Sequence, residues 1–210
     1  METDRLIAEY PRVFHMAPAT AWPSIEAQGL LTTEQLVDLY GVSEAGRASI
    51  LNSKRPSVVT LERHGMPTVV IRDQKPMKFI EDRIEPGSSL RLYLNAMNSR
   101  VFFWPTKERL TRLLGAKEYR GRSHVILHFD TAKLVERQAP RIELCRFNSG
   151  AVTQKNHPPR GHLSWLPVAE YPYDDFRKRY GRERALAEVT VRDGVPDVLD
   201  FVTDVEFVGA

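Results

Sequence analysis

The sequence predicts an α+β fold. Short stretches with the two-residue alternation of strands are mixed irregularly with short stretches of helical, 3.6-residue periodicity. No internal repeat, low-complexity segment or linker divides the 210 residues, of which 42% are hydrophobic. A chain of this length buries enough surface to fold without disulfides or metals. We therefore expect a single domain with one core over residues 1–210.

The first quarter of the chain predicts one strand followed by three short helices. The strand covers residues 13–16, and the helices cover residues 20–29, 32–41 and 43–52. Thr20 and Thr32 are expected to cap the first two helices, because a threonine hydroxyl accepts a hydrogen bond from a free backbone N–H. Gly29 suits the C-terminal end of the first helix. Residues 6–10 show no clear pattern.

The middle of the chain predicts a hairpin, helices and two further strands. The expected elements are strands at 55–62 and 67–72, helices at 77–84, 88–96 and 107–114, and strands at 98–105 and 124–130. The stretch 124–130 is apolar almost throughout, which is typical of a central strand covered on both faces. A basic loop at residues 119–122 precedes it.

The last third predicts strands around one long loop and one charged helix. Thr131 is expected to cap a short turn that ends at Val135. The expected elements after it are strands at 142–147, 188–191, 198–202 and 205–208, and a surface helix at 174–184. Residues 151–167 lack periodicity and are expected to form a long loop. Such loops in compact domains are usually functional or mobile.

Glu188 lies in a short stretch that alternates apolar and polar residues. Val189 and Val191 alternate with Glu188 and Thr190, and a Gly-Val-Pro turn signal follows. The simplest interpretation is a carboxylate on the solvated face of a strand, because most strand glutamates face water. The other interpretation is that Glu188 is the centre of a functional site.

Several kinds of site are disfavoured by the residue pattern. His124 and His128 lie four residues apart on an expected strand, hence about 13 Å apart at ~3.3 Å per residue, which is too far for one metal ion. We therefore expect no metal site. The single cysteine, Cys145, lies in an expected strand and should be a buried, inert thiol. Phosphate-loop, dinucleotide-binding and Gly-x-Ser-x-Gly patterns do not occur.

The composition also limits the location and the partners. No apolar run approaches the ~20 residues that cross a membrane, and the N-terminal residues lack the apolar core of a signal peptide. We expect a cytoplasmic protein without a membrane partner. The net charge of +3 is compatible with a nucleic-acid partner and does not establish one.

Five short motifs occur in the order that they have in a known fold. They are Phe14-His15, Gly29-Leu30, the aromatic stretch 101–104, Ala187-Glu188 and Val195-Pro196. In this order they resemble the ADP-ribosyltransferase fold, and within it the DarT-like DNA ADP-ribosyltransferases. The resemblance covers most of the chain as short motifs. It departs at Phe102-Phe103, where that family often has Tyr or Ser. The chain also resembles a bacterial family with no assigned activity.

The resemblance implies a split β-sheet core with short peripheral helices and NAD as the substrate. It also implies DNA or RNA as the acceptor, and an inhibitor or antitoxin protein as a partner. Glu188 and Arg100 are assigned to catalysis, although the matching arginine is not fixed by the motifs. The expected NAD contacts are His15, Met16, Phe102, Phe103, Trp104, Arg120 and Asn148.

A carboxylate suits this chemistry because breaking the bond between nicotinamide and ribose leaves positive charge on the sugar. Two unit charges 4 Å apart at an effective dielectric constant of 20 interact by about 4 kcal/mol. That energy corresponds to roughly a thousandfold in rate. Glu188 can also accept a hydrogen bond from the ribose 2′-hydroxyl.

Structural roles are open for the other residues of the expected site. His15 can be a core histidine, the aromatic residues can be core packing, and Arg100, Arg120 and Arg122 can be solvated charges. Residues 148–150 can form a turn or a polar wall of the site. The loop 154–165, which includes Trp165, can receive substrate by stacking on a base.

Three functional hypotheses follow. The first is a mono-ADP-ribosyltransferase that modifies a nucleic-acid base, with Glu188 at its centre. The second is a non-catalytic nucleic-acid or protein binding module on the same fold. The third, narrower hypothesis is an NAD-consuming RNA 2′-phosphate transferase.

Overall fold

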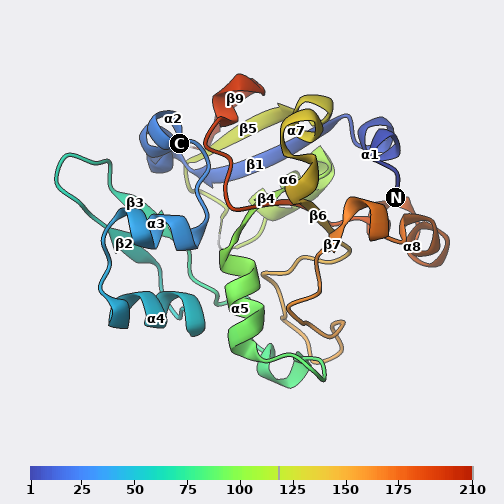
Figure 1. Cartoon of the computed structure of the whole chain (residues 1–210), viewed down its shortest axis with the longest axis horizontal. Helices are drawn as coiled ribbons and strands as arrows, with labels where there is room; N and C mark the ends of the chain where they lie inside the picture. The colour runs from blue at the N-terminus through green and yellow to red at the C-terminus, as the bar shows by residue number, and fades with distance from the viewer. Residues whose placement is uncertain (118, 210) are drawn as a thin grey trace.

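Two antiparallel sheets and a small hairpin are surrounded by short helices in the computed structural model, which describes residues 1–117 and 119–209 (Figure 1). The α+β class predicted from the sequence is confirmed. The first sheet has the order β1 (Arg12–Pro18), β5 (His124–Asp130), β9 (Val202–Val208). The second has the order β4 (Arg100–Phe103), β8 (Glu188–Arg192), β6 (Ile142–Cys145), β7 (Leu166–Pro167). The hairpin pairs β2 (Val59–Leu61) with β3 (Val69–Ile71).

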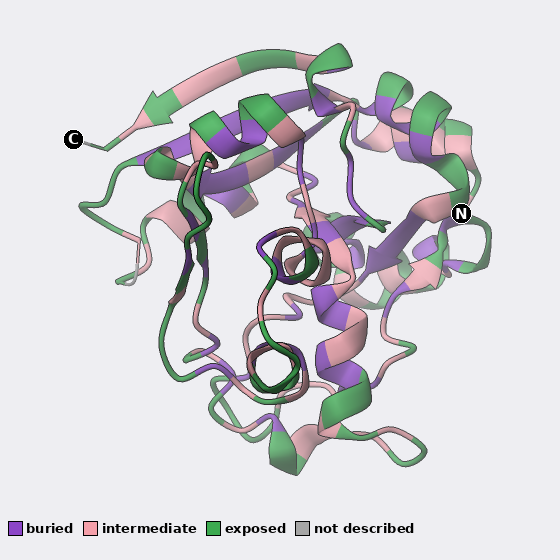
Figure 2. Cartoon of the chain, turned by 60° about the vertical axis from the view of Figure 1, so that its left-hand side comes forward, coloured by how far each residue is buried: buried purple, intermediate pink, exposed green. Residues whose placement is uncertain are grey.

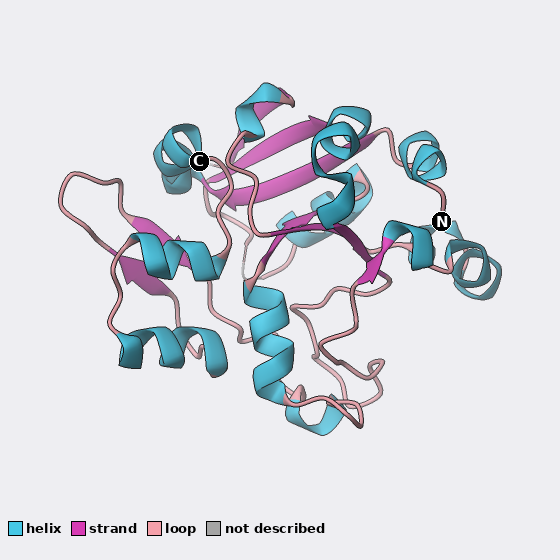
Figure 3. Cartoon of the chain, in the orientation of Figure 1, coloured by secondary structure: helices cyan, strands magenta, loops and turns pink. Residues whose placement is uncertain are grey.

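Short helices surround the two sheets and the hairpin (Figure 3). Their bounds are α1 Thr3–Glu9, α2 Trp22–Gln28, α3 Thr33–Leu39, α4 Glu44–Asn52, α5 Leu90–Asn98, α6 Lys107–Leu114, α7 Thr131–Gln138, α8 Tyr173–Tyr180 and α9 Arg182–Ala185. In Figure 1, α3, α4 and the hairpin lie on one side of the molecule, and α1 and α8 lie on the other. The loop between β6 and β7 runs beside α5, where the Tyr93 hydroxyl donates to the Ser149 carbonyl.

The two sheets meet along one edge of each. Phe14 of β1 and Trp104, which follows β4, exchange both backbone hydrogen bonds, at 2.9 and 2.7 Å. The Nδ1 atom of His15 lies 2.9 Å from the carbonyl oxygen of Phe102. His15 and the aromatic stretch are therefore adjacent, although almost ninety residues separate them in the chain.

The second sheet is buried on both faces (Figure 2). Phe103, Leu144 and Val189 pack into the main hydrophobic cluster between the two sheets. The opposite face carries Phe102 and Cys145, and it packs against a second cluster that contains Tyr93, Trp165 and residues of α5. The strand β8 is therefore central, between β4 and β6 and between two hydrophobic clusters.

Two of the motifs that carry the family resemblance pack directly against each other. Leu30 and Val195 exchange backbone hydrogen bonds at 2.9 and 2.7 Å. Gly29 has a φ angle of +74°, and a Cβ atom on it would lie 2.4 Å from the carbonyl oxygen of Pro196. Only glycine fits this left-handed position so close to another backbone.

Several element predictions are confirmed, among them the hairpin, α3 with its Thr32 cap, α4, α5, α6 and β5. Others are wrong because tertiary contacts decide them. The stretch 77–84 is no helix but turns and a short 3-10 segment, since the Phe79 N–H donates to Val152 in the long loop. Residues 6–10, which showed no pattern, belong largely to α1, whose Leu6 is buried.

Other corrections concern where elements begin and end. Asp130 rather than Thr131 caps the next helix, accepting from the Lys133 N–H, and the helix continues to Gln138. The helix α2 starts at Trp22 without the expected Thr20 cap. The charged helix breaks at Gly181, whose φ is +80°, and residues 198–200 form a 3-10 turn instead of a strand.

Candidate functional site

Glu188 is buried, so the interpretation of a solvated strand carboxylate is wrong. Its exposed fraction is 3%, and that of Thr190 on the same face is 0%. The polar face of β8 lies beneath α5 and the loop of residues 146–165. A local pattern of alternation could not show this, because the covering segments come from elsewhere in the chain.

One carboxyl oxygen of Glu188 is held firmly and the other is free. Oε1 accepts hydrogen bonds from the backbone N–H of Ser149 at 2.9 Å and from its hydroxyl at 3.2 Å. Oε2 is buried and has no hydrogen-bond partner among the described residues. Buried polar atoms without partners are uncommon and often mark functional positions. Glu188 is therefore the first candidate for a site.

Burial raises the pKa of Glu188 to about 7. The two hydrogen bonds from Ser149 and the positive charge of Arg160 oppose this rise, because each favours the ionised form. The indole N–H of Trp165 also favours the carboxylate, although it does not reach hydrogen-bond geometry and is itself unpartnered. A carboxyl group with a pKa near neutrality can exchange its proton at physiological pH.

Aromatic side chains form one wall of the site. The rings of Tyr93 and Trp165 stack with centroids 5.3 Å apart and planes inclined by 22°. Phe102 meets Trp165 edge-on at 6.3 Å. The Tyr93 hydroxyl donates to the Ser149 carbonyl at 2.9 Å, so the same wall also positions the loop that binds Glu188.

Arg160 is a buried cation that organises the loop. Its guanidinium donates to the carbonyl oxygens of Pro158, Asn148 and Ala151, and its Cζ lies 3.7 Å from the ring centroid of Phe147. These contacts fix the backbone on both sides of Ser149. Residues 148–150 were expected as a turn or a polar wall of the site. Residues 149 and 150 form a turn, and Ser149 of this turn contacts Glu188.

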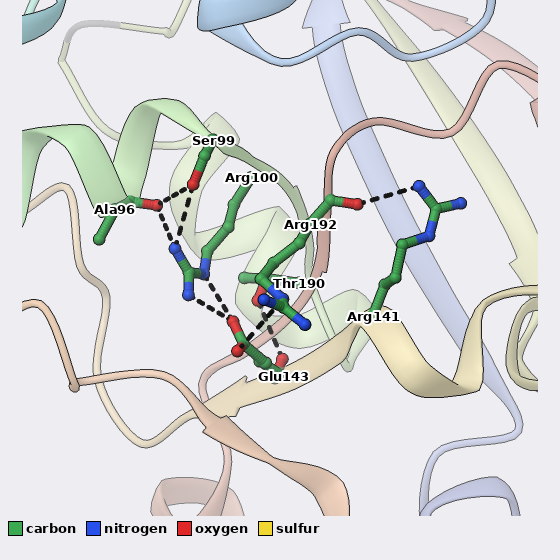
Figure 4. Close-up of polar contacts among 7 residues, drawn as sticks. All are labelled: Ala96, Ser99, Arg100, Arg141, Glu143, Thr190 and Arg192. Carbon is green, nitrogen blue, oxygen red and sulfur yellow. Dashed lines mark hydrogen bonds and ion pairs between the residues drawn. The ribbon is translucent and has the colours of Figure 1, made fainter.

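Arg100 is held by an ion pair on the same sheet face (Figure 4). Its Nε and Nη2 atoms donate to Glu143 at 2.8 and 2.5 Å, and Arg192 approaches the other oxygen of Glu143 at 3.5 Å. Arg100 pairs with Arg192 in the sheet, four residues from Glu188 and hence about 13 Å along the strand. The Arg100 guanidinium lies 4.7 Å from the Trp165 ring centroid. The indole ring of Trp165 therefore lies between Arg100 and the surroundings of Glu188.

His15 and Met16 point to opposite faces of β1. His15 lies at the edge where the sheets meet, bonded to the Phe102 carbonyl, and burial lowers its pKa. Met16 packs with Ile126 and Leu110 in a separate hydrophobic cluster. The structure therefore places His15 beside the aromatic strand and turns Met16 away from it.

The remaining predicted contacts are divided between site, core and surface. Phe102 is half-buried beside Trp165, whereas Phe103 is 1% exposed in the main cluster. Trp104 is half-buried and packs against the same hydrophobic cluster as Met16. Asn148 adjoins Ser149, and its backbone carbonyl oxygen accepts a hydrogen bond from Arg160. Arg120 is exposed on the loop that precedes β5.

Cys145 lies directly beside Glu188 on the neighbouring strand. It is fully buried, and desolvation raises the pKa of its thiol well above the usual value. The expected burial of this cysteine is confirmed. A thiol that remains protonated at neutral pH is a poor nucleophile.

Two cavities in the described part of the chain are lined by other residues. One of about 310 Å³ lies among α3, α4 and α5, and another of about 220 Å³ lies beside α7. Neither is lined by Glu188 or His15. Within the described residues, no cluster of three or more His, Cys, Asp or Glu side chains could hold a metal ion, and no helix is long and apolar enough to cross a membrane.

A protein-family model, described as a family of unknown function (DUF7002), matches residues 11–202. The match spans most of the sequence, and the chain belongs to this family. Searches of curated proteins and of solved structures found no match.

Proposed function

We propose that this member of the DUF7002 family is an NAD-dependent mono-ADP-ribosyltransferase in which Glu188 stabilises the transition state. The observation that carries the proposal is the Glu188 carboxyl group itself. One of its oxygens is fixed by Ser149, and the other is buried and unpartnered beside an aromatic wall. A preorganised group of this kind can meet the positive charge that develops on a substrate.

The arrangement of the sheets supports the proposal. Two antiparallel sheets meet at β1 and β4, which agrees with the split core that the family resemblance implies. His15 lies where they meet, and Glu188 begins the central strand of the second sheet. The paired motifs Gly29-Leu30 and Val195-Pro196 are also in contact.

In the proposed reaction the bond between the nicotinamide nitrogen and C1′ of the ribose breaks. Its electron pair goes to the nicotinamide ring, which becomes neutral, and C1′ becomes cationic. Ionised Glu188 stabilises that cation, and the acceptor then attacks C1′ and loses a proton to solvent. The positive charge of the nicotinamide ring in bound NAD favours ionisation of a carboxyl group whose pKa is about 7.

Binding of NAD requires the covering loop to move, because Glu188 is only 3% exposed. The bonds that hold the loop at this point come from the Ser149 backbone N–H and hydroxyl and from the Tyr93 hydroxyl. A ribose 2′-hydroxyl that donates to Oε2 would satisfy the atom that has no partner now.

We propose a nucleic-acid base as the acceptor, on the strength of the family resemblance and the net charge of +3. A toxin role and an inhibitor protein as partner rest on the resemblance alone.

Nicotinamide release from NAD tests the role of Glu188. The Glu188→Gln variant keeps the size of the side chain but cannot become negative, so we expect turnover to fall by about a thousandfold. Glu170→Gln is the matched control, because it makes the same chemical change at an exposed glutamate. Wild-type turnover in the Glu188→Gln variant would remove this residue from the reaction.

One observation favours the alternative of a non-catalytic binding module. Glu188 is almost inaccessible, and the two cavities described above lie elsewhere. This alternative predicts that NAD leaves the melting temperature unchanged, and that nucleic-acid binding weakens steeply with salt. An enzyme that binds NAD at ~100 times its dissociation constant gains roughly 2.7 kcal/mol, which raises the melting temperature by several degrees.

A further inference from the structure

Arg72 reaches from the end of the hairpin to the loop that precedes β5. Its Cζ atom lies 4.5 Å from the ring centroid of Tyr119, a distance typical of a guanidinium stacked on an aromatic face. Arg72 is exposed as a whole residue, although neighbouring protein desolvates its guanidinium, which is the largest cause of its lowered pKa. Stacking on Tyr119 restricts the guanidinium without using its hydrogen-bond donors.

Several positive or protonatable groups surround Arg72. The backbone N–H of Arg122 donates to the Tyr119 carbonyl at 3.2 Å, so Arg122 lies on the same turn as the ring that Arg72 contacts. The charge of Arg72 lowers the pKa of His15 and of His124, and Arg122 lowers the pKa of His124 as well. Among the described residues, the opposing charge that acts on Arg72 is Asp73, its neighbour in the chain. Like charges gathered in this way destabilise the free protein, and a bound anion relieves the repulsion.

A buried network holds the backbone of Arg72 in place. The Nε atom of Arg55, a residue only 8% exposed, donates to the Arg72 carbonyl at 3.0 Å. The backbone N–H of Arg55 donates to Gln74 at 3.0 Å, and its guanidinium donates to Asn98 at 3.1 Å. Both amide side chains are buried. The position of Arg72 is therefore set before any ligand binds.

We propose that Arg72, Tyr119 and Arg122 form a binding site for the diphosphate group of a nucleotide, next to His15. Guanidinium groups match the geometry of phosphate oxygens and bind them through paired hydrogen bonds. His15 Nδ1 donates to the Phe102 carbonyl, so Nε2 can donate to a phosphate oxygen only when the imidazole is protonated, a form that a bound anion favours. The identification of the nucleotide as NAD rests on the proposed function, whereas the preference for a diphosphate does not.

Titration calorimetry with inorganic pyrophosphate and with ADP-ribose, at constant ionic strength, tests this site without requiring turnover. We expect both probes to bind the wild type, and Arg72→Ala to weaken binding roughly tenfold or more, as expected for loss of one charged hydrogen bond. Arg91→Ala is the control, because Arg91 is an exposed arginine on α5, away from the hairpin. Arg122→Ala should weaken binding in the same direction as Arg72→Ala.

Failure of this proposal and failure of the proposed function are distinguishable. Pyrophosphate binding that is absent in the wild type, or equal in Arg72→Ala with an unchanged melting temperature, overturns the diphosphate site. The same holds if a single-stranded oligonucleotide binds through Arg72 while pyrophosphate and ADP-ribose do not. Arg72-dependent pyrophosphate binding in a wild-type protein that releases no nicotinamide from NAD upholds this site and refutes the proposed reaction alone.

Discussion

Glu188 carries an acidic group in surroundings that favour its neutral form. Burial outweighs the two bonds from Ser149 and raises its pKa from 4.5 to about 7. The folded protein therefore holds this proton more tightly than the unfolded chain does. The resulting contribution to stability is complete below about pH 4.5, and it is lost as the pH rises to about 7.

Glu188→Gln is expected to remove this pH dependence. One pKa unit corresponds to about 1.4 kcal/mol, so the wild type should lose about 3 kcal/mol of unfolding free energy between pH 4.5 and pH 7 through this residue. The glutamine variant has no proton to lose, so its stability should vary less over that range. Urea unfolding at several pH values measures the difference. If the unfolding free energy of the two proteins changed equally with pH, Glu188 would not be buried as a protonated carboxyl group.

A functional residue could be identified from the sequence where its neighbours in the chain mark it. Glu188 was identifiable because it follows Ala187 and precedes two alternating valines. Tyr93 belongs to α5, and nothing near it in the chain indicates that its hydroxyl supports Ser149, fifty-six residues later. Arg100 had the appearance of a catalytic arginine, but its pairing with Glu143 depends on a strand forty-three residues away.

At the scale of elements, the contact between α2 and the turn after β8 fixes two distant parts of the chain. Gly29→Ala should destabilise the fold, because the residue has a positive φ and its Cβ would meet the Pro196 backbone. Gly87→Ala is the matched control, since Gly87 has a φ of +83° and open space around it. The control should cost about 1 kcal/mol for the left-handed backbone alone.

We expect Gly29→Ala to cost at least about 2 kcal/mol more than Gly87→Ala, because the clash is with backbone atoms that cannot move aside. Thermal or urea unfolding of the two variants provides the comparison. Equal losses of stability would contradict the close packing of Gly29 on Pro196.

Helices and strands were predicted correctly where adjacent residues determine them. Thr32 and Gln35 form a capping box within one turn, so α3 could be recognised from adjacent residues. The apolar run of β5 likewise indicated a strand covered on both faces. The stretch 77–84 was predicted as a helix with Phe79 and Ile80 facing inward, but the Phe79 N–H donates to the Val152 carbonyl in the long loop instead of to a helical partner.

At the scale of the whole molecule, the covering loop decides what the site can do. Arg160 binds three carbonyl groups of this loop, and Ser149 closes it onto Glu188. The sequence indicated a long loop in this region but not its role as a cover. The α+β class was predictable from the mixture of periodicities, whereas the meeting of the two sheets at Phe14 and Trp104 depends on contacts ninety residues apart.

The most direct test of the central claim is the pH profile of nicotinamide release from NAD. The reaction needs Glu188 in its ionised form, so kcat/KM should rise about tenfold per pH unit and level off above about pH 7. Glu188→Gln should show little release at any pH. A wild-type protein that releases no nicotinamide, or a profile that is the same in both proteins, would contradict the account.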